Sequence, residues 1–192
     1  MASHFFIISV LFATTHYTAY SYIEPFLGRI ADMSPETVTI TLIIFGASGM
    51  LGSIAFGKLY MAHRYGFILT VTVGTVIALL LLLPSAASVA SVVLVCVAWG
   101  AMATAFNIAF QDNTIRFAPE NATSIAMSIF SGIYNLGIGS GAYIGGLVVT
   151  HASLEYIGYA AGTIGIIALA YCLLRLFPNM RRSENKMRKT VA

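Results

Sequence analysis

The chain has 192 residues, of which 58% are hydrophobic and only 9% are charged, and its formal net charge is +3. An ordinary soluble domain carries roughly 25% charged residues, so this composition excludes a soluble globular protein and predicts a membrane protein. The lipid bilayer is therefore the first expected partner, and we expect no nucleic-acid partner.

The apolar residues form blocks that are long enough to cross a bilayer, which takes about 20 residues of helix. Helices satisfy every backbone hydrogen bond within their own segment, so we predict an all-α membrane protein with six transmembrane helices. The predicted spans are about 5–24, 38–60, 66–83, 88–111, 124–149 and 156–177, in a domain that covers 1–180 and precedes a basic tail at 181–192.

The connection after the first span carries signals for one helix end and one helix start. Glu24 and Pro25 are expected to end the first span, because proline cannot continue the helical hydrogen-bond ladder. Ser34 then has the position of an N-cap, with Pro35 at the first helical position and Glu36 in the first turn. This pattern predicts a new helix from there.

The positive charges predict the orientation of the helices. Nine of the ten Lys and Arg residues lie on one side of the predicted topology, and Arg29 alone lies on the other. By the positive-inside rule, both termini are then cytoplasmic. The nine are Lys58, Arg64, Arg116, Arg175, Arg181, Arg182, Lys186, Arg188 and Lys189.

Polar side chains interrupt the first span at helical spacing. His16, Tyr20 and Glu24 are successive i,i+4 neighbours, so one helix face would carry an imidazole, a phenol and a carboxylate. Polar groups without partners are costly in hydrocarbon. We therefore predict that this face looks onto other helices or a water-filled cavity.

The fourth span repeats this pattern, with Trp99, Asn107 and Gln111 on one face. Amides at such positions can simply hydrogen-bond across a helix interface, which contributes about 0.6 to 2 kcal/mol each. Two such stripes in one chain favour a shared aqueous cavity instead, since a packing interface needs only Ser, Thr or Gly.

Glycines crowd the fifth span. Gly137, Gly141 and Gly145 form a small-xxx-small ridge. Gly132 precedes this ridge and Asn135 lies beside it. Such a ridge lets two helix backbones approach closely, either in static packing or in a contact that slides and bends, and the sequence leaves both open.

The connection between the second and third spans, residues 58–66, is short and basic and contains His63 and Arg64. It either terminates two helices or latches against a neighbouring helix end in one conformational state.

Neither a metal site nor an enzyme active site is indicated. Cys96 and Cys172 both fall inside predicted spans, where they are most simply small apolar residues. The sequence has no Gly-rich phosphate loop, no nucleophile paired with a base and no pair of carboxylates at hydrolase spacing. We therefore expect no enzymatic activity, no cofactor and no metal.

The order of the spans resembles one half of a transporter of the major facilitator superfamily. Polar faces on spans one and four and glycine-rich spans two and five form a three-plus-three repeat. In that family the first and fourth helices of each half line the central cavity, and the second and fifth contact the other half. The resemblance implies one half of the fold, namely helices seven to twelve.

Two stretches resemble bacterial sugar efflux transporters, which are similar to the drug:proton antiporters with twelve helices. They are residues 15–26, with the sequence THYTAYSYIEPF, and residues 130–142, with the sequence FSGIYNLGIGSGA. Two superfamily signatures are only partly present. His63 stands where the loop signature has an acid, and Gly146 stands at the proline of the antiporter signature.

The resemblance implies proton-coupled efflux of arabinose-like sugars and thiogalactosides by alternating access. His16 and Glu24 would then couple the proton, since histidine titrates near neutral pH and a carboxylate can join it. The expected substrate-binding residues are Tyr17, Tyr20, Trp99, Asn107, Gln111 and Asn135, and the expected packing or gating residues are Gly132, Gly137, Gly141, Gly145, His63 and Arg64.

The resemblance covers only one of the two six-helix halves that enclose such a cavity. The chain is thus expected to be a fragment of a longer transporter, a half-size subunit that pairs with a separate N-terminal half, or a subunit that pairs with a second copy. The alternative functions are a multidrug:proton antiporter half and a truncated bundle that binds a partner half without transporting. The expected location is a bacterial inner membrane, which the chain crosses several times.

Overall fold

The computed structural model describes residues 2–178, and in these residues the regular structure is helical throughout. The long helices are α1 (Ala2–Tyr20), α3 (Pro35–Ala55), α4 (Arg64–Leu80), α6 (Val89–Phe117), α7 (Thr123–His151) and α8 (Ile157–Tyr171). The short elements are α2 (Ile23–Arg29), α5 (Leu82–Ser85), 3-10 turns at Glu120–Ala122 and Leu154–Tyr156, and π-helical turns at Phe56–Tyr60 and Cys172–Leu176. The predicted all-α fold is confirmed, and the basic tail at 181–192 lies outside the described residues.

Four helical segments of the described chain are long and apolar enough to cross a membrane. They are Pro35–Tyr60, Val89–Arg116, Thr123–His151 and Leu154–Leu176. α4 is a shorter apolar helix, and α1 has 19 residues but carries the polar run at 14–18. The polar content of α1 is the feature that sets it apart from an ordinary membrane span.

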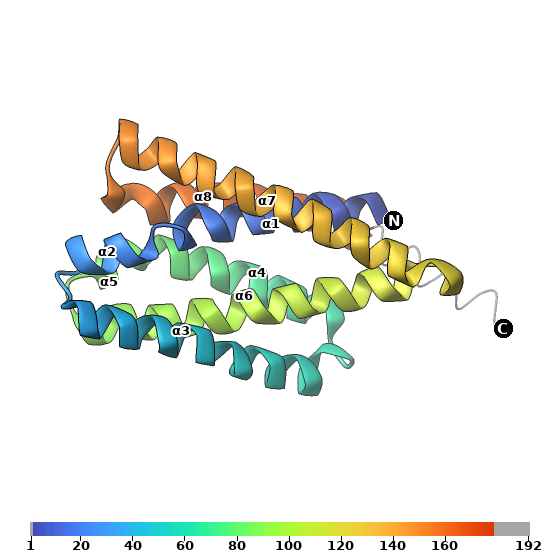
Figure 1. Ribbon diagram of the computed structural model, residues 1–192. Coiled ribbons are helices and arrows are strands. Elements are labelled where there is room, and N and C mark those ends of the chain that lie inside the picture. Colours follow the sequence, from blue (N-terminus) through green and yellow to red (C-terminus); the bar gives the residue numbers. More distant parts are fainter. Residues whose placement is uncertain (1, 179–192) are drawn as a thin grey trace.

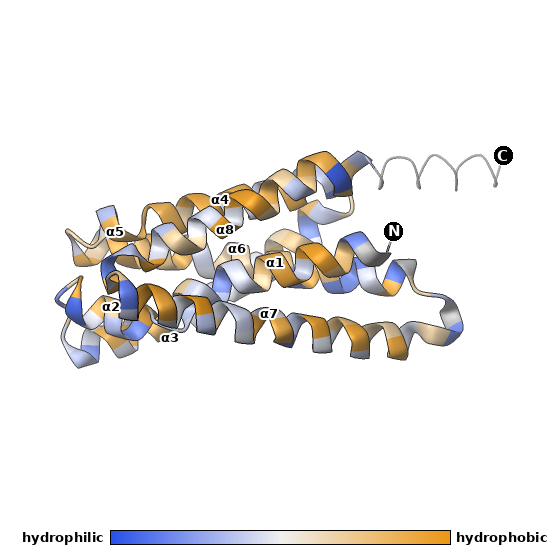
Figure 2. Ribbon diagram, turned by 90° about the horizontal axis from the view of Figure 1, so that it is seen from above, coloured by the Kyte–Doolittle hydropathy of each residue, from blue (hydrophilic) through white to orange (hydrophobic). Residues whose placement is uncertain are grey.

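The long helices run side by side, so that successive connections alternate between the two ends of the bundle (Figure 1). α2 and α5 lie at one end, whereas the α3–α4 and α6–α7 connections lie at the other end with the start of α1. Hydrophobic residues occupy most of the length of the helices, and hydrophilic residues gather toward the ends (Figure 2). This distribution fits a bundle that spans a bilayer with its connections in the two aqueous phases.

The first predicted span consists of two helices, which corrects the expected single helix. α1 ends at Tyr20 and α2 begins at Ile23. Pro25 has no N–H to donate to the carbonyl of Ser21, and its ring would clash with that carbonyl in a continuous helix. The break places Pro25 in the first turn of α2, where an N–H needs no helical partner. Glu24 therefore does not continue the polar face of α1.

The predicted start of the next helix is confirmed. Ser34 is the N-cap of α3, and its hydroxyl oxygen accepts a hydrogen bond from the backbone N–H of Thr37 at 3.3 Å. Pro35 is the first helical residue and Glu36 lies in the first turn. These local signals fix where α3 enters the bundle.

The glycine ridge of α7 packs directly against α1. Gly137, Gly141 and Gly145 are buried, and a Cβ atom at Gly141 would lie only 2.7 Å from the carbonyl oxygen of Thr14. Gly132 does not take part, because a Cβ there would meet nothing within 4 Å. The ridge is thus a close backbone contact inside this bundle.

A second glycine contact joins α3 to α6. A Cβ atom at Gly49 of α3 would lie 2.6 Å from Oγ1 of Thr104, and a Cβ atom at Gly100 of α6 would lie 2.5 Å from the carbonyl oxygen of Phe45 in α3. α3, the second long helix, therefore packs on α6, the fourth, in the same way as α7, the fifth, packs on α1, the first. The second helix of each three-helix repeat thus packs on the first helix of the other repeat, as a three-plus-three repeat requires.

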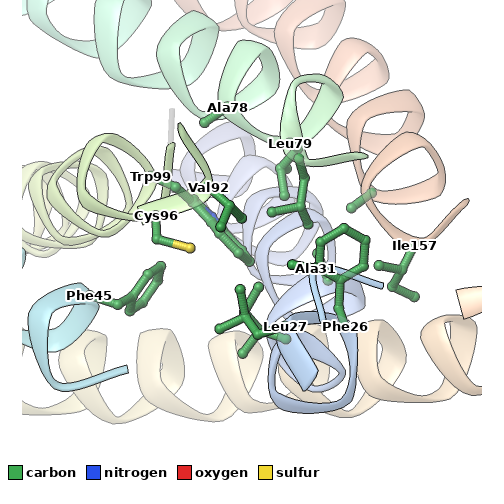
Figure 3. Packing of buried hydrophobic residues seen from close by; sticks show 14 of the residues in the cluster. Phe26, Leu27, Ala31, Phe45, Ala78, Leu79, Val92, Cys96, Trp99 and Ile157 are labelled. Carbon is green, nitrogen blue, oxygen red and sulfur yellow. The ribbon is translucent and has the colours of Figure 1, made fainter. Parts of the chain in front are cut away.

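Two hydrophobic clusters fill the bundle, one toward each end. At the α2 end, Phe26 and Leu27 lie among Leu79 of α4, Trp99 of α6 and Ile157 of α8 (Figure 3). At the other end, aromatic rings of α1, α4 and α6 form the second cluster. The polar run of α1 lies between the two.

We predict that Gly141→Ala destabilises the bundle by about 1 to 3 kcal/mol, because the added methyl group has to push α7 away from α1. The unfolding temperature of the purified chain in detergent, followed by circular dichroism, should fall. Gly139→Ala is the matched control, since a Cβ there meets nothing within 4 Å. An equal loss of stability in both variants would contradict the packing role of the ridge.

Candidate functional site

The polar run of α1 buries four polar side chains, and three of them are threonines. Thr15 and Thr18 donate hydrogen bonds to the carbonyl oxygens of Leu11 and Thr14, at 2.8 and 2.7 Å. Hydroxyls that bond to their own helix in this way can be buried at little cost. His16 differs, because its buried Nδ1 has no hydrogen-bond partner among the described residues.

Aromatic rings surround His16. Its imidazole stacks on the ring of Tyr20 with centroids 5.1 Å apart, and it meets the ring of Trp99 edge-on at 5.3 Å. Phe45 of α3 stacks on Tyr20 at 5.2 Å and meets Trp99 at 5.1 Å. Tyr17 meets the imidazole edge-on at 4.8 Å. Rings from α1, α3 and α6 thus form one cluster that holds the imidazole in place.

Trp99 lies behind this cluster and is fully buried. Its indole Nε1 can only donate a hydrogen bond, and it has no partner among the described residues. Two buried nitrogen atoms without partners, one on His16 and one on Trp99, therefore lie in the same cluster. Such groups are rare in folded proteins and mark places where function or bound water has to be considered.

A cavity of about 320 Å³ opens beside these rings, between α1, α3, α6 and α7, and we call it the aromatic cavity. Aromatic rings and small polar groups line it, and none of its described lining residues is Asp, Glu, Lys or Arg. Its lining residues are His16, Tyr17, Tyr20, Phe45, Gly100, Ala103, Thr104, Asn107 and Tyr134.

The structure brings together one predicted proton-coupling residue, His16, and several predicted substrate-binding residues. His16, Tyr17, Tyr20 and Asn107 all line the aromatic cavity. Gln111 does not line it but donates a hydrogen bond from Nε2 to Oδ1 of Asn107. Gln111 therefore orients the Asn107 amide from one helical turn away.

Three lining side chains were not predicted from the sequence, namely Phe45, Thr104 and Tyr134. The predicted Asn135 is exposed and does not line the aromatic cavity. Its neighbour Tyr134 takes that place, because successive helix positions point about 100° apart and the glycine contact of α7 with α1 sets the rotation. The i,i+4 spacing of Phe130 and Tyr134, whose rings stack in the structure, was the signal in the sequence that could have identified Tyr134.

Glu24 lies apart from His16. It lines a larger cavity of about 990 Å³ between α2 and α3, together with Arg29. No residue lines both this cavity and the aromatic cavity. The helix break after Tyr20 therefore separates the two side chains that the sequence assigns to proton coupling.

The turn between α3 and α4 contacts the end of α6. Asn113 donates a hydrogen bond from Nδ2 to the hydroxyl of Tyr60 at 2.6 Å, and both side chains are fully buried. Arg116 pairs with Asp112 at 2.6 Å and also lies 3.1 Å from the sulfur of Met61. The turn is therefore anchored on a neighbouring helix end.

His63 and Arg64 both belong to this turn. Arg64 lies over the ring of Tyr60, 5.8 Å from its centroid. His63 is the exposed residue before α4 and makes no side-chain capping bond. Neither residue reaches the aromatic cavity.

The described residues contain no group of three His, Cys, Asp or Glu side chains that could hold a metal ion. Cys96 and Cys172 are buried free thiols. Both cysteines belong to the hydrophobic clusters.

Among known protein families, the model of the Major Facilitator Superfamily matches residues 5–190 of this chain. The match spans nearly the whole sequence and includes every residue of the aromatic cavity.

We predict that a water-soluble maleimide labels Asn107→Cys and spares Ala109→Cys in the detergent-solubilised chain. Asn107 lines the aromatic cavity, whereas Ala109 is fully buried on the same helix. A thiol reacts as the thiolate, which water has to reach, and the buried Cys96 and Cys172 should add little background. Equal labelling of the two variants, with equal amounts verified after denaturation, would contradict an open cavity.

Proposed function

The chain belongs to the Major Facilitator Superfamily, and from this premise we propose that it is the C-terminal half of a proton-coupled sugar efflux transporter. Membership indicates secondary active transport and not enzymatic catalysis. The helical bundle, with four membrane-length segments and the shorter α4, is consistent with half of the family fold. Substrate, direction and coupling are parts of the proposal.

The aromatic cavity carries the proposal. A sugar presents hydroxyl groups around its edge and C–H groups on its faces, so it matches polar partners flanked by aromatic rings. Tyr17, Tyr20 and Asn107 supply hydroxyl and amide groups in this proposal, and Phe45 and Tyr134 supply rings. An uncharged lining favours a neutral solute over an ionic one.

Residues around the aromatic cavity also have proposed roles in solute binding. Gln111 holds the amide of Asn107, and the free Nε1 of Trp99 is the donor that a solute or water reaches when the rings in front of it move. Asn135 is exposed on α7. It is proposed to contact the solute only if the second half extends the binding site over that face of α7. Arabinose-like sugars and thiogalactosides are the proposed substrates, because residues 15–26 and 130–142 resemble sugar efflux transporters.

His16 is the proposed proton-coupling residue. Among the described residues that line the aromatic cavity, it is the single histidine, the residue type whose ordinary pKa lies closest to neutral pH. An imidazolium ion surrounded by rings is costly unless water or a partner stabilises it. Proton occupancy therefore depends on whether the cavity is open and whether a solute fills it, which is the condition for antiport. Glu24, in its separate cavity, is proposed to act at the outer mouth rather than on the same proton.

A second six-helix unit is proposed to close the aromatic cavity. Tyr20 is 37% exposed at its edge, and polar groups there would otherwise face hydrocarbon. The unit is the rest of a longer chain, a separate N-terminal half or a second copy, in that order of preference.

The proposed location is a bacterial inner membrane with both termini in the cytoplasm. Lys58, Arg64 and Arg116 belong to the end of the bundle that holds the α3–α4 and α6–α7 connections (Figure 1). Arg29 ends α2 at the opposite end. By the positive-inside rule, this distribution of charge supports a cytoplasmic position for the end with the α3–α4 and α6–α7 connections.

Accumulation of labelled arabinose or a thiogalactoside in cells tests the substrate and the direction together. Cells that make the chain with its second half should accumulate less label than cells without it, and an uncoupler should abolish the difference. Equal accumulation in both would sink the sugar assignment.

A multidrug antiporter half is the alternative, and the ring cluster around His16 is the observation that favours it. Aromatic faces bind flat and cationic drugs as well as sugars. A drug-susceptibility panel with the same cells separates the two functions. A bundle that only binds its partner half would change neither sugar accumulation nor susceptibility.

We predict that His16→Gln abolishes transport driven by a pH gradient while exchange of labelled for unlabelled sugar continues, because glutamine keeps a polar side chain that cannot carry the proton. Both rates are measured in proteoliposomes that contain the assembled transporter. His151→Gln, at the exposed end of α7, is the matched control. If the His16 variant still transports fully in response to a pH gradient, His16 has a packing role and does not couple the proton.

A further inference from the structure

An apolar groove of about 520 Å³ lies between α3, α4 and α6, and we call it the α3–α4 groove. Small residues keep it open, because they leave room between the three helices. These are Gly52, Ala55, Gly66, Ala101 and Ala105. No residue lines both this groove and the aromatic cavity, and α4 contributes only to the groove. The groove and the aromatic cavity are therefore separate from each other.

The α3–α4 groove is open along one side. Leu51 and Leu59 on its edge are 56% and 55% exposed, and Thr70 on its α4 wall is also exposed. Almost all of the lining is apolar. Its volume falls within the roughly 300 to 1,000 Å³ that small-molecule sites occupy, so a flexible hydrocarbon chain can enter it from the membrane.

Basic residues gather where this groove reaches the α3–α4 turn. His63 lines the groove, and Lys58 and Arg64 lie in the same turn. Arg64 makes no ion pair among the described residues and contacts the sulfur of Met61 at 3.8 Å. The acid at the neighbouring end of α6, Asp112, is already paired with a different arginine. The turn therefore presents positive charge at the mouth of an apolar groove.

We propose that the α3–α4 groove binds an anionic phospholipid, with one acyl chain in the groove and the phosphate at Lys58, His63 and Arg64. Basic pockets between transmembrane helices recognise anionic headgroups, and each basic residue near the surface adds attraction. The hydrocarbon tail matches the apolar groove, which a phosphate could not occupy. The phosphate matches the basic turn, which a hydrocarbon tail could not occupy. This lipid is a structural ligand, and its binding does not depend on what the aromatic cavity transports.

Lipid binding to the purified chain tests the proposal. The chain in detergent is titrated with dioleoylphosphatidylglycerol or with dioleoylphosphatidylcholine, and bound lipid is counted by native mass spectrometry. A contribution of about 1 kcal/mol from each basic residue corresponds to roughly fivefold in affinity. Removing two charges in Lys58→Gln with Arg64→Gln should therefore weaken phosphatidylglycerol binding roughly 30-fold and phosphatidylcholine binding much less, because the choline group offsets the charge of its phosphate. Arg29→Gln, at the other end of the bundle, is the control.

Filling the groove tests the acyl chain separately. Thr70→Phe should weaken binding of both lipids, whereas Thr163→Phe, at an exposed position of α8, should not. Gly66→Leu is a second filling variant, because a Cβ there meets only the Cβ of His63 at 4.0 Å. Equal affinity for the two lipids, or unchanged phosphatidylglycerol binding in both filling variants, would overturn the proposal. Full displacement of the lipid by equimolar inorganic phosphate would do the same, since it would reduce the site to a simple anion site.

Discussion

The cost of carrying polar side chains through an apolar bundle governs how α1 is built and what surrounds it. Its threonine hydroxyls bond to their own helix, and α7, α8 and α6 cover most of its length. Its imidazole is enclosed by rings rather than by hydrogen-bond partners, with Nδ1 left unpaired. His16, Tyr17 and Tyr20 form the side of α1 that lines the aromatic cavity. The cavity is thus the place where the remaining polar groups of α1 can meet water or a solute.

The glycine contacts explain how so polar a helix can be held in place. With no side chain between the backbones at Gly141, α7 lies directly on α1, and α3 lies on α6 in the same manner through Gly52. Contacts of this kind are densely packed and specific in membranes. The helices that position the aromatic cavity are therefore tied to one another within this bundle. We infer that movement during transport occurs between this bundle and a second half, as rigid-body rocking requires.

The sequence predicted the parts of the structure that depend on local or periodic signals. The all-α class, the cap at Ser34 and the glycine ridge of α7 each follow from residue type and spacing. The break before Pro25 was placed too late, because the proline conflict acts on a carbonyl four residues earlier. That error put Glu24 on the same predicted helix face as His16 and Tyr20. The choice of Tyr134 over Asn135 depends on the rotation of α7 about its axis, which only the tertiary contact with α1 decides.

Quenching of Trp99 fluorescence by brominated phospholipid tests most directly whether the polar faces of α1 and α6 look into a closed cavity. Trp99 is the single tryptophan of the chain and lies in the ring cluster behind that cavity. The chain alone and its assembly with the proposed second half, made free of tryptophan by substitution, are compared in bilayers of the same lipid. The account predicts stronger quenching in the chain alone than in the assembly, because the proposed second half replaces lipid in front of the rings that cover Trp99. Equal quenching in both would mean that lipid covers this face in the working protein, and it would contradict the account.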